Sequence, residues 1–400
     1  MITVAIISEY NPFHTGHKHH IDKIREEFGD DCTIVAIMSG NYTQRGEVAI
    51  ADKTLRAKLA VINGINLVLE IPFPFSISSA EFFAKSGVKI ADSLGNIDYI
   101  SFGSECGDIN KIKKAANVLN SLEFKDIFLK LSSDETKGYP KLCEDAYKVL
   151  CPDDSFSFTA NNILAIEYVR ALNSCNSDIK PHTVMRSGAG YNDSQIGSFS
   201  HQSAMAIREK IRDLDFSALN YIPNIKNNTL ISLSQSGEFP TDINKISTAL
   251  ISFFRLNPPL ENSDIQDAND GLYNRLHNLS FGANDISSLL ELSETKRYTK
   301  ARIRRAMLNS YFGVTSSEVK KLPHYTQVLA MDKKGMLVLK TVRKQEEFKI
   351  LTKPSDYKNF NDVQMHQKLL SDKADSIFEL TKPAPVPKRT WLTFTPFIKK

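Results

Sequence analysis

The chain has 400 residues, of which 42% are hydrophobic, 24% charged and 9% aromatic. The length predicts two domains or one large domain with an appendage, and the composition excludes a disordered or collagen-like chain. The formal net charge of +4 hides an asymmetry, because residues 291–400 contain 23 Lys and Arg against 11 Asp and Glu, a net charge of +12, which leaves −8 for residues 1–290. This asymmetry predicts a polyanion-binding region attached to a differently charged body.

Short apolar segments alternate with longer amphipathic ones through the first half of the chain. Strands are expected at residues 4–8, 33–38, 67–71, 99–102 and 182–185. Helices are expected at residues 15–28, 51–63, 79–94 and 203–212. Strands alternating with helices of this length indicate βαβ units, and therefore a Rossmann-like parallel sheet in an α/β fold.

The intervening stretch at residues 109–172 has a mostly helical pattern, with breaks at Gly138-Tyr139-Pro140 and Cys151-Pro152-Asp153-Asp154. We interpret it as an insertion or a lid. Residues 217–290 are expected to contain helices but carry no motif that indicates a function.

The cysteines and the apolar segments indicate where the protein functions. The five cysteines are scattered and form no CxxC pair, so they predict neither a disulfide framework nor a zinc ribbon. No basic segment precedes the apolar N-terminus, and no apolar run approaches the ~18 residues of a membrane span. We expect a cytoplasmic protein with no membrane partner.

The most specific motif is His14-Thr15-Gly16-His17, an HxGH sequence directly after the first strand and at the start of a helix. A helix N-terminus offers free N–H groups and a positive dipole to a phosphate, and Gly16 removes the side chain where a nucleotide approaches closely. Imidazoles three residues apart share one side of the first turn and can donate hydrogen bonds to a phosphoryl group as charge develops. We therefore interpret His14 and His17 as catalytic.

Two other interpretations of this motif remain open at this point. In the first, the histidines are ordinary residues of a solvated helix start. In the second, they belong to a metal site, since His14, His17, His19 and His20 fall within seven residues. No carboxylates or cysteines with ligand spacing accompany them, so we predict no protein-held metal.

With this motif the sequence resembles the HxGH nucleotidyltransferase superfamily, and more narrowly the bacterial tRNA(Met) cytidine acetate ligase family. The resemblance covers nearly the whole chain and rests on five separated motifs. These are Glu9-Tyr10-Asn11-Pro12-Phe13-His14-Thr15-Gly16-His17, Met38-Ser39-Gly40-Asn41-Tyr42-Thr43-Gln44-Arg45-Gly46-Glu47, Phe102-Gly103-Ser104-Glu105, Asn161-Asn162-Ile163-Leu164 and Arg186-Ser187-Gly188-Ala189-Gly190-Tyr191.

The resemblance implies an enzyme that forms acetyl-adenylate from acetate and ATP and then acetylates N4 of the wobble cytidine of elongator tRNA(Met). Mg²⁺ is expected to accompany ATP, because phosphate charge usually needs a hard cation. The resemblance also implies a set of ATP-binding residues: Ile7, Ser8, Glu9, Tyr10, Asn11, Pro12, Phe13, His14, Thr15, Gly16, His17, Lys18, His19, His20, Gly103, Asn162, Arg186 and Ser187.

One departure from the superfamily concerns a signature resembling ISSTKIR, whose Lys meets the phosphates. In this chain Ser203-Ala204-Met205-Ala206-Ile207-Arg208 has Ala206 at that position. We expect Arg186 to supply the missing charge, because a guanidinium suits bidentate phosphate contact. The alternatives are that Arg186 caps a turn, that Gly103, Gly188 and Gly190 serve turn geometry alone, and that Asn162 caps the helix after it.

The polar loop after the second strand is the place where the superfamily generally binds its acceptor or acid substrate. Ser39, Asn41, Gln44 and Arg45 offer donors to a small carboxylate, although a polar loop without a ligand has the same composition. The identity of acetate comes only from the resemblance.

A basic run near the C-terminal third carries six cations in ten residues and is the predicted RNA-binding segment. It comprises Lys296, Arg297, Lys300, Arg302, Arg304 and Arg305. A solvated helix face is the alternative. In the tail, Lys388, Arg389, Trp391 and Phe394 mix cations with aromatic rings, but we expect Trp391 to pack in a core.

We therefore predict an HxGH nucleotidyltransferase-like catalytic domain at residues 1–215 and a mostly helical region at residues 216–400, basic from about residue 291. Two rival functions are an HxGH enzyme with a small-molecule acceptor and a noncatalytic RNA-binding protein. Chain length and the basic C-terminal region argue against the first, and the intact His14, Gly16 and His17 argue against the second.

Overall fold

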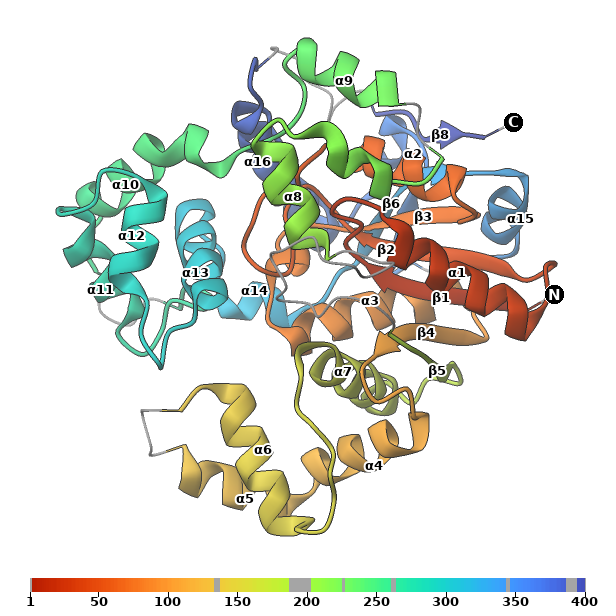
Figure 1. Ribbon diagram of the computed structural model, residues 1–400, viewed down its shortest axis with the longest axis horizontal. Helices are drawn as coiled ribbons and strands as arrows, with labels where there is room; N and C mark the ends of the chain where they lie inside the picture. The colour runs from red at the N-terminus through yellow and green to blue at the C-terminus, as the bar shows by residue number, and fades with distance from the viewer. Residues whose placement is uncertain are drawn as a thin grey trace.

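A computed structural model describes residues 2–132, 137–186, 203–224, 227–259, 264–342, 346–385 and 394–399. Its centre is a mainly parallel sheet with the strand order β5-β4-β1-β2-β3-β6-β7 (Figure 1). The first five strands are β1 (Thr3–Ser8), β2 (Thr33–Ser39), β3 (Leu67–Ile71), β4 (Tyr99–Ser104) and β5 (Lys180–Met185). All five are parallel and begin and end within two residues of their predicted positions, so the predicted Rossmann-like sheet is confirmed.

Helices cover both faces of this sheet because its strands are apolar on both sides. Successive residues of β1 alternate between two cores: Val4 and Ile6 pack on one side, Ala5 and Ile7 on the other. The first core is closed by α1 (Thr15–Phe28), α2 (Lys53–Ile62) and α8 (Ala204–Arg212), and the second by α3 (Ala80–Leu94) and α7 (Ala160–Ser174).

Two helical groups extend from the sheet on different sides (Figure 1). The predicted insertion consists of α4 (Ile109–Asn120), α5 (Leu122–Leu131) and α6 (Tyr139–Leu150). The second group, which we call the helical cluster, consists of α10 (Ser247–Leu256), α11 (Leu272–Ser280), α12 (Ile286–Ser293) and α13 (Lys300–Phe312), and it has its own apolar core.

The remaining described elements are short or lie near the C-terminus. They are η1 (Phe75–Ile77), η2 (Phe216–Tyr221), α9 (Asn227–Gln235), η3 (Ile243–Ile246), α14 (Ser316–Lys320), α15 (Lys333–Thr341), η4 (Pro354–Asn359), α16 (Asp362–Phe378) and η5 (Glu379–Thr381), with strands β6 (Tyr325–Met331), β7 (Lys349–Leu351) and β8 (Phe397–Ile398). Among the described residues, no helix combines the length and the apolar character that crossing a membrane requires.

The C-terminal strands join the central sheet, although they lie in the region from residue 216 onward that the sequence predicts to be mostly helical. Strand β6 pairs antiparallel with β3, and both β7 and β8 pair with β6. Every residue of β6 is buried, because the strand completes the central sheet. The region after residue 216 is therefore helical for much of its length and also contributes a strand to the central sheet.

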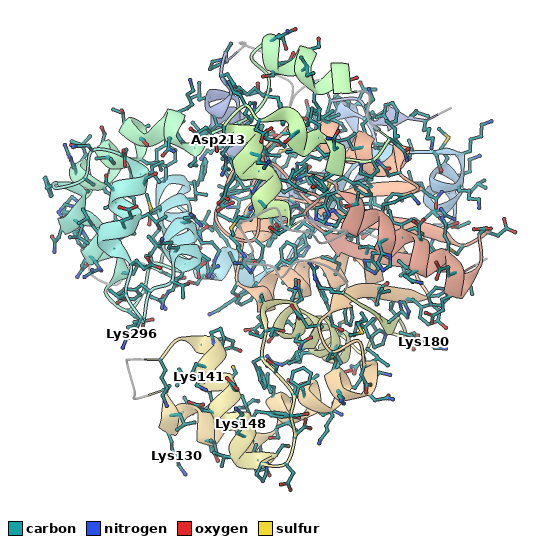
Figure 2. The ribbon with its side chains drawn as sticks, in the orientation of Figure 1. Lys130, Lys141, Lys148, Lys180, Asp213 and Lys296 are labelled. Carbon is teal, nitrogen blue, oxygen red and sulfur yellow. The ribbon has the colours of Figure 1, made fainter. Side chains whose placement is uncertain are left out.

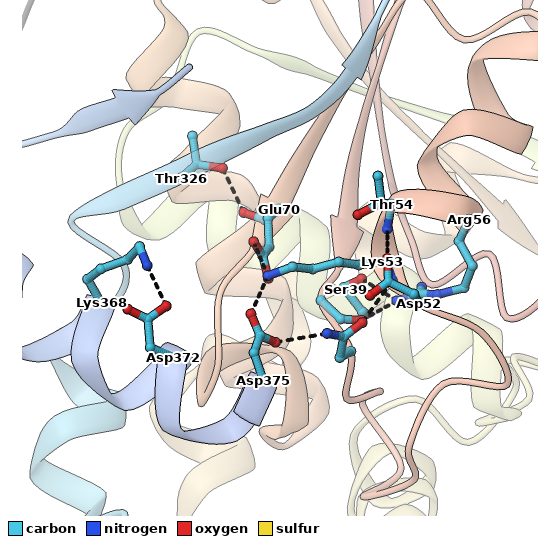
Figure 3. Close-up of polar contacts among 12 residues, drawn as sticks. Ser39, Asp52, Lys53, Thr54, Arg56, Glu70, Thr326, Lys368, Asp372 and Asp375 are labelled. Carbon is cyan, nitrogen blue, oxygen red and sulfur yellow. Dashed lines mark hydrogen bonds and ion pairs between the residues drawn. The ribbon is translucent and has the colours of Figure 1, made fainter. Parts of the chain in front are cut away.

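A buried ion-pair network ties α16 to the sheet (Figure 3). The Nζ of Lys53, at the start of α2, lies 2.7 Å from Oε1 of Glu70 on β3 and 2.7 Å from Oδ2 of Asp375 on α16. The side-chain amide of Asn41 donates to the other Asp375 oxygen at 2.9 Å. Charges in such a buried position are tolerated only when each has a partner. One lysine therefore joins residues that are more than 300 positions apart in the chain.

Replacement of Lys53 by Met tests this connection. The variant leaves two buried carboxylates without their cation, and we expect the free energy of unfolding to fall by about 3–5 kcal/mol. Lys58→Met, an exposed lysine of the same helix, is the control and should change stability by less than about 0.5 kcal/mol. Urea unfolding monitored by circular dichroism measures both, and equal midpoints for the two variants would contradict the assignment.

Candidate active site

Backbone N–H groups at the start of α1 fix the tautomer of both histidines of the HxGH motif. The Nδ1 of His14 accepts a hydrogen bond from the Gly16 N–H at 3.0 Å, and the Nδ1 of His17 accepts one from the His14 N–H at 3.2 Å. Each neutral ring then carries its proton on Nε2. The ring centroids lie 3.8 Å apart. The motif therefore presents two neighbouring N–H donors to whatever occupies the adjoining pocket.

Aromatic packing fixes the loop that leads into this helix. Tyr10 and Phe13 are buried, their ring centroids lie 5.0 Å apart, and the Tyr10 ring meets the edge of His17 at 4.8 Å. Tyr10 has a φ of +44°, a conformation that is costly for a residue with a side chain. Such strain persists only where the surroundings determine the conformation, as these ring contacts do.

A buried arginine holds the loops after β1 and β2 together. The Arg56 guanidinium is fully buried and donates to the carbonyl oxygen of Glu9 at 2.5 Å, to that of Ser39 at 3.1 Å and to that of Gly40. A further contact links the same loops, because Oε1 of Glu9 accepts from the Gln44 N–H at 2.8 Å. The loop after β1 and the polar loop after β2 are thereby held as one unit.

These loops border a cavity of about 340 Å³, which we call the nucleotide pocket. It opens at the carboxyl ends of the parallel strands, where ligands of open α/β sheets bind. Ten of the predicted ATP-binding residues line it: Ile7, Ser8, Glu9, Tyr10, Asn11, His14, His17, His20, Gly103 and Arg186. The motifs that the sequence analysis singled out therefore converge on one cavity.

Other predicted ATP-binding residues do not line the pocket. Pro12, Phe13, Thr15, Gly16, Lys18 and His19 belong to the same loop and helix without forming its wall. Asn162 is buried behind the wall, where Oδ1 accepts from the N–H groups of Glu105 and Cys106 at 2.9 and 3.2 Å. It therefore shapes the loop after β4, and the N-cap position of α7 belongs to Thr159, whose side chain makes no capping hydrogen bond. Ser187 lies outside the described residues, as do Gly188, Gly190 and Trp391.

Gly103 and Arg186 pack directly on each other. A Cβ atom at Gly103 would lie 3.1 Å from Cγ of Arg186, closer than side chains normally approach. The Arg186 N–H donates to the Ser104 carbonyl at 2.9 Å, which sets the start of the side chain. Glycine at this position thus allows the Arg186 stem to lie flat along the pocket wall.

Further arginines reach the pocket that the sequence analysis did not assign to ATP. Arg45 lines it from the polar loop, Arg208 from α8 and Arg305 from α13. Arg208 donates to the Asn11 carbonyl at 2.9 Å, whereas Ala206 is buried and is not part of the wall. The signal for Arg208 was present in the sequence, because it occupies the final position of the altered ISSTKIR-like signature.

The polar loop divides into structural and pocket-lining residues. Ser39 is buried, and both side-chain groups of Asn41 are used, by Asp375 and by the Lys53 N–H. Gln44 and Arg45 line the pocket. Of the four predicted carboxylate donors, the structure therefore brings two to the cavity.

The basic run is partly neutralised within the protein. The structure pairs Arg305 with Asp267 at 2.9 Å, Arg302 with Asp270 at 2.9 Å and Arg304 with Glu47 at 3.0 Å. Lys296 and Lys300 are exposed, and Lys300 lies 3.4 Å from Glu294. The run is thus not one solvated face, since Arg302 and Arg305 hold the loop before α11 while the two lysines face solvent.

Comparison with known proteins decides the family. The model of the HIGH nucleotidyl transferase family matches residues 1–390. A tRNA(Met) cytidine acetate ligase of Caldanaerobacter subterraneus is 37% identical over 90% of this chain and 90% of its own length, and one of Clostridium perfringens is 34% identical over 90% and 91%. The chain belongs to the tRNA(Met) cytidine acetate ligase family.

Solved structures agree with this membership. The apo structure of TmcAL from Thermotoga maritima is 28% identical, with a TM-score of 0.91 over 100% of this chain and 99% of that chain. The same protein bound with alpha-thio ATP gives a TM-score of 0.90 over the same shares. The fold of this family member is therefore that of a relative whose structure has been solved with an ATP analogue.

Desolvation favours the neutral form of His17 and of His20 in this family member. Burial, with His14 and Arg186 nearby, holds the pKa of His17 well below its ordinary value. Burial and the neighbouring His182 and Arg186 lower the pKa of His20 to about 3. His20 Nε2 lies 2.7 Å from the Ser101 hydroxyl, which also contacts His182 Nδ1 at 2.9 Å. Burial likewise raises the pKa of Glu9, although the Gln44 N–H opposes the shift.

The lowered pKa of His20 predicts acid sensitivity of the fold. The unfolded chain takes up this proton below about pH 6.5, whereas the folded chain takes it up only near pH 3. Stability contributed by neutral His20 is thus present above pH 6.5 and falls as pH falls, by at most about 1.4 kcal/mol per pH unit. In His20→Gln the free energy of unfolding should fall less steeply between pH 6.5 and 4.5 than in the wild type, and parallel slopes would contradict this.

Proposed function

We propose that this protein activates acetate with ATP and acetylates N4 of the wobble cytidine of elongator tRNA(Met). The observation that carries the proposal is the pair of Nε2–H donors of His14 and His17 in a pocket lined by four arginines. The family membership and the relatives' names supply the substrates. The proposal thus joins a phosphate-binding site of this chain to the chemistry of its family.

The first step needs stabilisation of charge on a phosphate. One acetate oxygen attacks the α-phosphorus of ATP, the bond to the bridging oxygen breaks, and pyrophosphate leaves. The histidine donors face the developing charge at a helix N-terminus, where their hydrogen bonds are worth most in the transition state. Arg186 and Arg208 line the same wall and suit the remaining phosphates. We assign the acetate carboxylate to Gln44 and Arg45.

The second step transfers the acetyl group. The N4 amine of cytidine attacks the acetyl carbonyl carbon. The bond between this carbon and the phosphate oxygen of AMP breaks, and N4 loses one proton as AMP leaves. The cytidine must be unstacked for N4 to reach the adenylate, as it can be in a single-stranded loop. The exposed Lys296 and Lys300 are candidates for phosphate contacts on the RNA.

Mg²⁺ is expected to enter with ATP rather than to occupy a site built by the protein. The described residues contain no group of three or more His, Cys, Asp or Glu side chains that would hold a metal. Glu9 is the carboxylate in the described lining of the nucleotide pocket. The donor set thus fits a cation held mainly by phosphate oxygens and water, which would neutralise phosphate charge when bound.

His17→Asn tests the role of the histidine donors. Asparagine can still accept from the His14 N–H, but it has no group at the position of Nε2. We expect acetate-dependent ATP–pyrophosphate exchange to fall about 10²- to 10³-fold with an unchanged melting temperature. Lys23→Met, an exposed residue of the same helix outside the pocket wall, is the control. Wild-type exchange in His17→Asn would contradict the proposal.

The same assay separates the rival functions. Exchange that depends on a different carboxylic acid, with no acetyl transfer to RNA, would indicate a small-molecule acceptor. RNA binding without any exchange would indicate a noncatalytic protein. Acetate-dependent exchange together with N4-acetylcytidine formation in tRNA(Met), detected by mass spectrometry, is the result we expect.

Arg186→Lys tests the phosphate cation. Lysine keeps the charge but loses the planar fork, so we expect the KM for ATP to rise about tenfold, the equivalent of roughly 1.4 kcal/mol. Gly103→Ala should have a smaller effect in the same direction, because the new methyl group displaces the Arg186 stem. Arg170→Lys on α7, whose guanidinium contacts Glu167 and Asn120, is the control. An unchanged KM in Arg186→Lys and Arg186→Ala would assign Arg186 to the turn alone.

A further inference from the structure

A second cavity of about 210 Å³ lies between the polar loop, the end of α8 and the helical cluster. Figure 2 labels Asp213, which directly follows the last residue of α8, on the side of the molecule nearer the helical cluster. The cavity is lined by Gly46, Glu47, Val48, Arg212, Asp242, Ile243, Asn244, Leu250, Ile286, Ser287, Leu290, Arg304, Met307 and Leu308. None of these residues lines the nucleotide pocket.

The floor and the rim of this cavity differ in chemistry. Val48, Leu250, Met307 and Leu308 form an apolar floor, and each is at most 2% exposed. The rim carries the exposed side chains of Asn244, Ser287 and Arg212. A ligand that fits must therefore have an apolar or planar part for the floor and a polar part for the rim, where Arg212 and Arg304 lie near the carboxylates of Glu47 and Asp242.

Two arginines supply the positive charge. Arg304 pairs with Glu47 at 3.0 Å and keeps 30% of its side chain exposed. Arg212 lies near Glu47 and Asp242, but within the described part of the chain it forms no ion pair as close as 4.0 Å.

The polar loop forms a wall between the two cavities. Gln44 and Arg45 line the nucleotide pocket, while the next two residues, Gly46 and Glu47, line the second cavity. Glu47 also lies 3.4 Å from Arg208, which lines the nucleotide pocket.

Close packing makes this wall rigid. Gly46 has a φ of +72°, and a Cβ atom there would lie 2.5 Å from the Arg305 backbone nitrogen. The loop therefore sits directly against α13, and a ligand in the second cavity lies next to one in the first.

We propose that the second cavity binds one unstacked nucleotide of the RNA substrate, adjacent to the cytidine that is acetylated. The base lies on the apolar floor, the rim groups contact its polar edge, and the phosphate lies against Arg212 and Arg304. Single-stranded RNA is recognised through bases splayed out in this way. The volume is below the ~300 Å³ at which pockets for larger ligands begin, and it suits a single base. This inference rests on the proposed function only in naming RNA as the ligand.

Binding of an RNA hairpin tests the rim. The probe is a fluorescent 17-nucleotide anticodon stem–loop with the elongator tRNA(Met) loop sequence, titrated by anisotropy over a salt series. Arg212→Ala should weaken binding about fivefold or more and reduce the slope of log K against log salt by roughly 0.7. Lys210→Ala, a neighbouring cation on α8 that pairs with Asp215 and does not line the cavity, should change affinity less than twofold.

Abasic substitution tests the floor. In the wild type, removing the base at one loop position next to the cytidine should weaken binding about fivefold or more. Ser287→Trp places a large ring at the exposed rim without altering the core, and in this variant the same abasic substitution should cost nothing further. Glu291→Trp, an exposed residue of α12 outside the cavity, should retain the wild-type response.

Exchange in the absence of RNA separates failure of this proposal from failure of the proposed function. All four variants should retain wild-type acetate-dependent exchange and melting temperature. Wild-type RNA affinity in Arg212→Ala together with an unchanged abasic response in Ser287→Trp would overturn the second site and leave the proposed function intact. Absence of exchange in the wild type would overturn the proposed function, while the RNA titrations would still judge the cavity.

Discussion

The geometry of the nucleotide pocket depends on the buried guanidinium of Arg56. Parallel strands end at the same edge of a sheet, and the carbonyl groups of the loops that follow have no strand partners there. A buried carbonyl without a donor is costly, and arginine supplies five N–H groups in one plane. Arg56 gives them to the loops after β1 and β2 at once. The HxGH helix and the polar loop are consequently positioned relative to each other by a residue that does not line the pocket.

Local sequence patterns predicted what local interactions determine. Short apolar runs identified β1 to β5, and the HxGH sequence identified the start of α1, because strand burial and helix capping involve neighbouring residues. The pairing of β6 with β3 was not predictable in this way, since it joins segments more than 250 residues apart. The same holds for the buried set of Lys53, Glu70 and Asp375, whose members show no pattern in the sequence.

The charge arithmetic was informative for the region and misleading for individual residues. It identified the cationic C-terminal segment but could not show that Asp267 and Asp270 lie against Arg305 and Arg302. Those acids come from a loop about 30 residues earlier, outside the segment that was counted. Conversely, Arg305 borders the nucleotide pocket, so a residue that charge density assigned to RNA lines the same cavity as Arg186 and Arg208.

The position of β6 in the sheet has a consequence for synthesis on the ribosome. When the first 185 residues have emerged, β1 to β5 can pair, but β3 remains an edge strand with unpaired backbone groups, the kind of edge that promotes aggregation. Strand β6, which covers this edge, is made only with residues 325–331. The ion pair of Lys53 and Glu70 gains its third member only with Asp375. The nascent chain therefore carries an uncovered edge at β3 until residue 331 has been made, and Arg305, the last described residue of the nucleotide pocket, is made while that edge is still open.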